Sequence, residues 1–356
     1  MNNIFNCTVL AVLILMIGCK PDPDAIPQGA YEFGIFVVNE GVYGQSSGTI
    51  TYYNPDSARL VQDIFKLANG RDLGNVVQSM YFHAEKVFVV VNNSNKIEVA
   101  NANDFKEIAQ ISGLQQPRYF LPISADKALV SQWGADLISG SIAVVDLNTN
   151  TVVQTISSQI GKGPENMLLQ NSKVYVANVG GLEFDNFISV IDVNNLQVID
   201  RIVTDDAPNS LQIGNSGTLW VACRGKTVYA NYPEIDTMAS TYGALLEIDL
   251  NNGNIINRIQ LQRGRGASNL AKGVNSNELY FLYDNAICRL NTATGQWQYL
   301  VQGSFYGLGA KQGENYIYAC SNSGIQAAWV YRFNAADGVK VDSFKAGVFA
   351  NSIYFR

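Results

Sequence analysis

A short phrase recurs seven times along the chain, and this repetition constrains the fold more than any other feature. The three clearest copies are AVVDLNT, SVIDVNN and LEIDLNN, which begin at Ala143, Ser189 and Leu246. The others emerge when each copy is aligned on the Asp or Asn that ends its apolar run, because Ile, Leu or Val then always stands four positions earlier. The seven anchor residues are Asn54, Asn101, Asp146, Asp192, Asp249, Asn291 and Asn334.

The spacing of the anchors indicates the class of fold. Differences between successive anchor numbers are 47, 45, 46, 57, 42 and 43. A period of about 40–50 residues with strand-like alternation is typical of β-propeller blades. The fourth copy reads NMLLQ, KVYVAN, FISVIDV and LQVIDRI, which indicates four short antiparallel strands joined by turns. The sequence therefore predicts an all-β fold of seven four-stranded blades.

The two ends of the repeat array differ from its middle. The first copy has no counterpart of the first strand, and the closing residues GVFANSIYFR resemble a first strand with nothing after it. We expect this C-terminal strand to complete blade 1, because ring closure hides strand edges that an open array exposes. The predicted propeller is a single domain over residues 33–356.

The N-terminal segment reads as an export signal. The run Ile4–Ile17 is almost wholly apolar and short, and MIGC ends at Cys19. This resembles the lipobox of bacterial lipoproteins, although the n-region lacks Lys and Arg; an uncleaved anchor or another signal is the alternative. The prediction is a signal peptide over 1–18, lipidation of Cys19 and a proline-containing tether over 19–32. Its acidic residues resemble surface-export signals, which predicts a surface-exposed outer-membrane lipoprotein.

Composition excludes several functions. A net charge of -6 and a pI near 4.9 provide no basic stripe for nucleic acid. One histidine excludes histidine-rich metal sites, and we predict neither a metal nor a cofactor. With Cys7 in the signal, Cys223, Cys288 and Cys320 remain without a CxxC pattern and are expected to be buried. The anchors are interpreted as turn residues rather than ligands.

Loop lengths indicate where a ligand binds. In a meander, the loops between second and third strands lie on one face, here the upper face, with the links between blades. The long loops all fall on this face. The longest is Arg224–Gly243, which explains why the anchors Asp192 and Asp249 are 57 positions apart. His83 falls on the opposite, lower face. Function is therefore expected on the upper face.

The candidate ligand-binding residues form three groups. Loop aromatics provide contact area, although each of them also has a structural reading as loop packing; they are Tyr43, Trp133, Phe184, Tyr229, Tyr232 and Tyr242. Matching positions at the start of the first strands predict a ring at the channel mouth, made of Gln78, Arg118, Glu165, Asn209, Ser268, Tyr306 and Asn351. The loop arginines Arg71 and Arg224 complete the set. Such amide, hydroxyl and aromatic groups suit an amide-rich or polyol ligand, and no nucleophile with its base is evident.

Several motifs resemble known propellers. KVYVANVG, KVFVVVNNSNKIEVANA and SVIDVNN resemble the YncE-like seven-bladed propellers. VNEGVYGQSSGTITYYNP, NGRDLGNVVQSM and VYRFNAADGVKVDSFKAGV are similar to bacterial surface propeller lipoproteins that include the BtuG-like corrinoid binders. This resemblance implies capture of cobalamin, as ligand rather than cofactor, above the propeller and transfer to a TonB-dependent outer-membrane transporter.

The expected function is therefore non-catalytic capture of cobalamin or a related corrinoid. One alternative is a protein-interaction or glycan-binding propeller without corrinoid affinity. A third is a lactonase-like hydrolase or a calcium site that uses upper-face carboxylates, namely Glu165, Glu183, Asp185 and Asp136.

Overall fold

The computed structural model describes residues 29–214 and 217–356. The predicted signal peptide over 1–18, the lipidation site Cys19 and most of the tether over 19–32 lie outside the described residues. No helix within the described part of the chain is long and apolar enough to cross a membrane.

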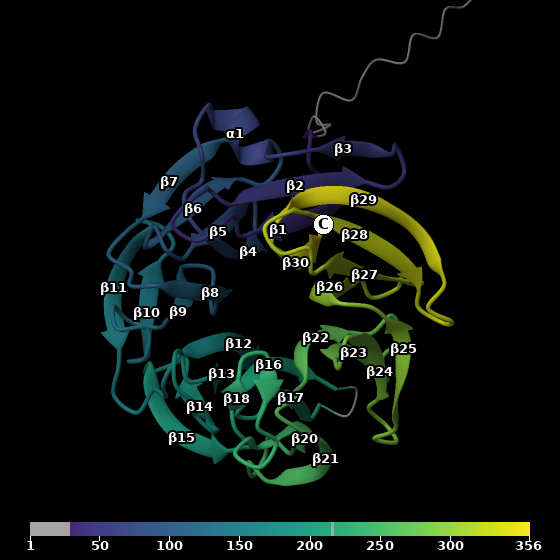
Figure 1. Ribbon diagram of the computed structural model, residues 1–356. Coiled ribbons are helices and arrows are strands. Elements are labelled where there is room, and N and C mark those ends of the chain that lie inside the picture. The colour runs from purple at the N-terminus through teal and green to yellow at the C-terminus, as the bar shows by residue number, and fades with distance from the viewer. Residues whose placement is uncertain (1–28, 215–216) are drawn as a thin grey trace, which may run out of the picture.

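Seven four-stranded antiparallel sheets stand in a ring, as the sequence predicts (Figure 1). From the innermost strand outward, blade 1 contains β30 (Ala350–Phe355), β1 (Ile35–Asn39), β2 (Thr49–Asn54) and β3 (Arg59–Val61). Blade 2 contains β4 (Val77–His83), β5 (Lys86–Val91), β6 (Lys96–Asn101) and β7 (Glu107–Ile111). Blade 3 contains β8 (Pro117–Pro122), β9 (Lys127–Gln132), β10 (Ser141–Asp146) and β11 (Thr151–Ile156). Blade 4 contains β12 (Pro164–Gln170), β13 (Lys173–Asn178), β14 (Phe187–Asp192) and β15 (Gln197–Val203).

The remaining blades follow the same order. Blade 5 contains β16 (Pro208–Ile213), β17 (Leu219–Cys223), β20 (Tyr242–Ile248) and β21 (Ile255–Arg263). Blade 6 contains β22 (Ser268–Lys272), β23 (Glu278–Tyr283), β24 (Ala286–Asn291) and β25 (Trp297–Gln302). Blade 7 contains β26 (Phe305–Ala310), β27 (Tyr316–Ser321), β28 (Ala327–Asn334) and β29 (Lys340–Val348).

The C-terminal strand closes the ring, as the sequence predicts. β30 pairs with β1 in antiparallel register, with Ile35 opposite Phe355 and Val37 opposite Ile353. Blade 1 is thus built from both ends of the chain. This pairing covers the edge that β1 would otherwise expose.

The seven anchors are turn residues, which confirms their structural interpretation. In each, a side-chain oxygen accepts a hydrogen bond from the backbone N–H two residues later, over 2.8–3.0 Å. This Asx turn directs the chain from the third strand into the fourth. The repeat is therefore visible in the sequence because each blade requires this local bond.

The core lies between neighbouring blades. Second and third strands are buried on both sides: Phe88 of β5 stacks on Phe120 of β8 at 4.3 Å between centroids. Trp220 of β17 is fully buried toward blade 6. Cys223, Cys288 and Cys320 are buried free thiols, as expected. Stability thus depends on stacked neighbours, because one blade cannot cover both of its faces.

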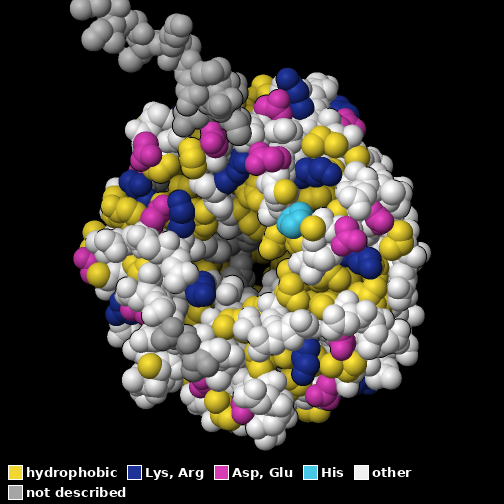
Figure 2. Space-filling view, turned by 180° about the vertical axis from the view of Figure 1, so that it is seen from behind, with side chains coloured by type: hydrophobic (Ala, Val, Ile, Leu, Met, Phe, Trp, Pro, Cys, Tyr) yellow, Lys and Arg dark blue, Asp and Glu magenta, His cyan; other side chains and the backbone are white. Residues whose placement is uncertain are grey.

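Two inserted segments lie outside the seven four-stranded sheets. α1 (Ile64–Asn69) lies between β3 and β4 at the outer edge (Figure 1). A hairpin of β18 (Tyr229–Asn231) and β19 (Glu234–Ile235) lies within the long upper-face loop of blade 5. Figure 2 shows the lower face, where the histidine lies near the central opening.

Candidate functional site

A cavity of about 260 Å³ occupies the upper mouth of the channel. All seven positions of the sequence-predicted ring line it, and they come from the innermost strands of all seven blades. Arg224 also lines it. The other lining residues are Glu40, Tyr119, Asn166, Ser210, Asn269, Leu270, Leu308 and Ser352. The structure therefore brings together the ring residues that the sequence selected.

Each innermost strand has a β-bulge that directs its ring side chain toward the channel. In each one, pairing with the second strand shifts by one residue at or next to the ring position. In blade 5, for example, Pro208 pairs with Cys223 and Ser210 with Ala222, which leaves Asn209 as the extra residue. A β-bulge redirects side chains and is frequent beside functional sites.

Five blades also enter their innermost strand through a left-handed residue. It stands two positions before the ring residue, at Val76, Gln116, Gly163, Ala207 and Phe349. A β-branched residue such as Val76 is rare at a φ of 57°. Such strain persists only where surrounding contacts hold it.

The polar layer connects every pair of neighbouring blades. Each junction has at least one hydrogen bond or ion pair from the ring residue, its successor in sequence, or Glu40. The bonds are Asn351 Nδ2 to Gln78 O, Ser79 Oγ to Arg118 O, Arg118 to Glu165, Leu211 N to Asn166 Oδ1, Asn209 Nδ2 to Ala267 O, Asn269 Nδ2 to Tyr306 O and Tyr306 Oη to Glu40. These groups therefore hold the ring together, and a ligand role must use their remaining hydrogen-bonding capacity.

A charged cluster occupies the wall formed by blades 2–4. The Arg118 guanidinium donates to Glu165 Oε1 over 2.6 and 2.9 Å and to Gln78 Oε1 over 2.6 Å. The Arg118 guanidinium also lies over the Trp133 ring, with its Cζ atom 4.2 Å from the ring centre. The side chain of Arg118 is 17% exposed and that of Glu165 7%. Burial lowers the pKa of Arg118, but Glu165 outweighs it and raises the pKa overall.

Glu40 is a cavity residue that the sequence reasoning missed. Its Oε1 accepts from Tyr306 Oη at 3.0 Å and from Asn351 Nδ2 at 2.9 Å. Burial raises the pKa of the Glu40 carboxyl, although both hydrogen bonds oppose this shift. The predicted ring at the channel mouth was drawn from first-strand positions, whereas Glu40 directly follows the second strand β1. The NEG sequence after an apolar strand was the available signal.

None of the predicted loop aromatics lines the cavity, and Trp133 contacts it only through Arg118. Tyr232 is 83% exposed and contacts Tyr229 at 5.2 Å between centroids. Tyr242 lies under the Arg263 guanidinium, and Phe184 faces Lys226. Tyr43 is exposed. They lie in upper-face loops or, for Tyr242, at the start of β20 beside such a loop, so a ligand larger than the cavity would meet them outside it.

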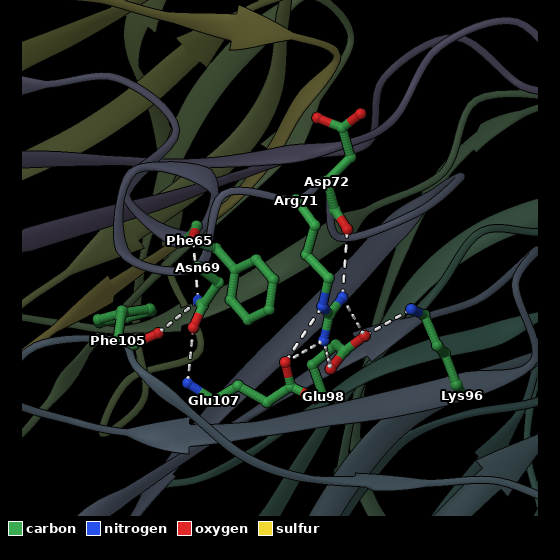
Figure 3. A network of polar contacts seen from close by, with 8 residues as sticks. All are labelled: Phe65, Asn69, Arg71, Asp72, Lys96, Glu98, Phe105 and Glu107. Carbon is green, nitrogen blue, oxygen red and sulfur yellow. Dashed lines mark hydrogen bonds and ion pairs between the residues drawn. The ribbon is translucent and has the colours of Figure 1, made fainter.

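Arg71 contacts β6 and β7, the two outer strands of blade 2, and does not line the cavity. Figure 3 shows its polar contacts. Its guanidinium donates to Glu98 over 2.8 and 3.0 Å and to Glu107 over 3.1 Å. Lys96 is the second cation on Glu98, whose side chain is fully buried. Arg71 also lies 5.0 Å from the Phe65 ring centre of α1. The network therefore attaches the α1 segment to the blade.

The remaining upper-face carboxylates stabilise loops. Asp136 accepts from the backbone N–H groups of Ile138 and Ser139. Glu183 forms an ion pair with Lys162. Asp185 accepts from the N–H of Lys162. Across residues 29–214 and 217–356, no group of three or more His, Cys, Asp or Glu side chains is arranged to hold a metal ion.

The ring and its polar mouth define a seven-bladed β-propeller with a small upper-face cavity. Residues 33–355 match the family described as "Domain of unknown function (DUF5074)", and the chain belongs to this family. None of the curated proteins compared with the sequence matches it.

Several solved structures resemble the chain along most of its length. The periplasmic gluconolactonase of Pseudomonas aeruginosa is 13% identical with a TM-score of 0.67, over 91% of this chain and 99% of that one. A Lactobacillus plantarum protein is 13% identical with a TM-score of 0.64, over 91% and 99%. A quinonprotein alcohol dehydrogenase-like protein from Bacteroides thetaiotaomicron is 14% identical with a TM-score of 0.64, over 91% and 78%. At these identities the similarity establishes the fold alone.

Proposed function

We propose that this propeller is a non-catalytic binding protein that captures cobalamin or a related corrinoid at its upper face. The observation that carries the proposal is the convergence of seven polar ring positions on one cavity, beneath loops with exposed aromatic side chains. Amide and hydroxyl groups can hydrogen-bond the carboxamide arms of a corrinoid, and tyrosines provide contact area at low entropic cost.

The size of the cavity constrains how a corrinoid binds. At about 260 Å³ it is smaller than typical pockets for drug-sized ligands, which are about 300–1,000 Å³. Only an arm of the ligand enters the mouth, and the corrin ring lies across the loops that carry Trp133 and Tyr232. In this arrangement, the polar cavity and the aromatic side chains of the upper-face loops form one site. These aromatic side chains, which include Trp133 and Tyr232, are called the aromatic rim.

The proposed cellular setting follows from the N-terminal sequence. Lipidation of Cys19 would tether the propeller to the outer membrane, and residues 20–32 would let it reach a TonB-dependent transporter. The ligand would then pass from the upper face to that transporter. A protein-interaction or glycan-binding propeller is the alternative within the class of binding proteins.

Titration calorimetry with cyanocobalamin tests the proposal directly. We expect the protein lacking residues 1–19 to bind at micromolar concentration or tighter. Absence of heat and of a spectral change at that concentration would remove the corrinoid as ligand. Glycan binding without corrinoid binding would favour the alternative.

A lactone hydrolase is the second candidate, and Glu40 is the observation that favours it. A partly buried carboxyl with a raised pKa keeps its proton at higher pH, so it can donate that proton to a lactone oxygen. The gluconolactonase similarity supports testing this activity. We would expect Glu40→Gln to abolish turnover of a sugar lactone, whereas Glu183→Gln, at an exposed loop ion pair, would preserve it. Absence of turnover by the unmodified protein excludes this candidate.

A further inference from the structure

Arg224 differs from every other arginine of the chain. The sequence has eleven arginines, all within the described residues, and ten of them direct the guanidinium to a hydrogen-bond or ion-pair partner. Among residues 29–214 and 217–356, Arg224 alone has no such partner for its guanidinium, and it lines the cavity. An unpaired guanidinium keeps all five of its donors available.

The backbone that carries Arg224 is held firmly. Its N–H donates to Ala207 O at 2.9 Å, and the N–H of Gly225 donates to Asp206 O at 2.9 Å. Gly266 of the link to blade 6 packs against it so closely that an added Cβ would lie 1.9 Å from the Arg224 carbonyl oxygen. The side chain therefore extends from a fixed point, which reduces the entropy lost when it binds a ligand.

The charge of Arg224 is not neutralised by the acids of the same cavity. Glu165 is already bound by Arg118, and Glu40 by Tyr306 and Asn351. Burial and Glu40 raise the pKa of Tyr306, and Arg118 and then Arg224 oppose this shift, so the Arg224 guanidinium lies within electrostatic reach of that phenol. The nearby part of the wall is neutral and polar, with Asn209 and Ser268.

We infer that Arg224 is an anion-binding residue and that the ligand of the channel mouth carries a phosphate or carboxylate group. The inference rests on the proposed function, because it assumes that the mouth holds a ligand. The guanidinium binds such a group through two parallel N–H donors. Hydroxyl or amide groups of the same ligand then meet the neutral wall of blades 5 and 6.

Two sources supply this chemistry. The phosphodiester of a cobalamin nucleotide loop would place the corrinoid arm in the mouth. The carboxylate of a small sugar acid would fit inside the cavity and need no contact with the aromatic rim. Four probes separate them: cyanocobalamin, cobinamide without the phosphodiester, gluconate and inorganic phosphate.

The experiment measures the affinity of each probe for the protein lacking residues 1–19 and for three variants. Arg224→Gln removes the positive charge and the parallel N–H donors of the guanidinium, whereas Arg224→Lys keeps only the positive charge. Lys127→Gln is the matched control, since Lys127 is an exposed residue at the lower-face end of β9 and the change in net charge is the same. Arg224 is exposed, so Arg224→Gln is expected to fold.

We expect Arg224→Gln to weaken binding of the anionic ligand at least tenfold and to reduce the salt dependence of that binding. Lys127→Gln should leave the affinity and its salt dependence unchanged. Arg224→Lys should fall between them. A preference for cyanocobalamin over cobinamide that Arg224→Gln removes identifies the phosphodiester. Arg224-dependent binding of gluconate or phosphate without cobalamin binding supports the inference while refuting the proposed function. The inference is overturned if cyanocobalamin binds Arg224→Gln as tightly as the unmodified protein, or if none of the four probes binds.

Discussion

The two walls of the channel mouth use arginine in opposite ways. On the wall of blades 2–4, Arg118 is largely buried and bonded to Glu165 and Gln78. On the wall of blades 5–7, Arg224 is exposed and unpaired among the described residues. The first arginine is part of the framework, because its bonds connect three blades. The second is free to meet a ligand, so the difference separates structure from recognition within one cavity.

Removal of Arg118 should have the largest effect. Arg118→Ala leaves the buried Glu165 carboxylate without its counter-charge, which lowers the free energy of unfolding by about 3–5 kcal/mol. Urea denaturation measures the change. Arg224→Ala is the control and should stay within about 0.5 kcal/mol, because Arg224 is exposed. Equal losses in the two variants would contradict the contrast between the walls.

Substitution of Gly266, which packs against the Arg224 backbone, should have the next largest effect on stability. A methyl group at Gly266 meets the Arg224 backbone, so Gly266→Ala should lower the free energy of unfolding by about 1–3 kcal/mol. Gly309→Ala is the matched control, since its methyl group meets Ile353 Cβ at 2.9 Å and no backbone atom comes as close as at Gly266. Denaturation of both variants tests this, and a larger loss at Gly309 would argue against a rigid support for Arg224.

The aromatic rim should affect binding more than stability. Trp133→Ala and Tyr232→Ala should each weaken cyanocobalamin binding by about 1 kcal/mol or more if these residues are anchors. Tyr299→Ala removes an exposed aromatic of the outermost strand of blade 6 and should leave affinity unchanged. Calorimetry measures all three. Unchanged affinity in both rim variants would move the site away from this rim.

Glu40 should have the smallest effect, visible as a dependence on pH. Burial raises its folded-state pKa above the ordinary value of 4.5, so its contribution to stability is fully present below that value and is lost as pH rises through the folded pKa. Glu40→Gln removes this titration and keeps an acceptor for Tyr306 and Asn351. The stability of the unmodified protein relative to Glu40→Gln should therefore fall between about pH 4 and the folded pKa and then level off. Denaturation across pH measures it, and a relative gain of stability with rising pH would reverse the assignment.

The blade count, the strand order and the site of closure were predictable because each is encoded by a local pattern. Asp192 and its six counterparts form a bond only two residues long, and the apolar alternation around them repeats in every blade. The ring positions were also predictable, since Asn209 and its equivalents occupy the same place in each first strand. Their role in binding stays a prediction.

Sequence alone determined the ring of seven blades and the positions that face its mouth, because bonds between near neighbours leave a repeated signature. Only the tertiary structure decided the partners at that mouth. The Arg118–Glu165 pair joins residues 47 positions apart, and Glu40 meets Asn351 across 311 positions. Such pairings depend on how the ring closes and on where each bulge directs a side chain. For the same reason, only the folded chain distinguishes Arg71, bound to Glu98 at the outer part of blade 2, from Arg224, whose guanidinium has no partner among the described residues and lines the cavity.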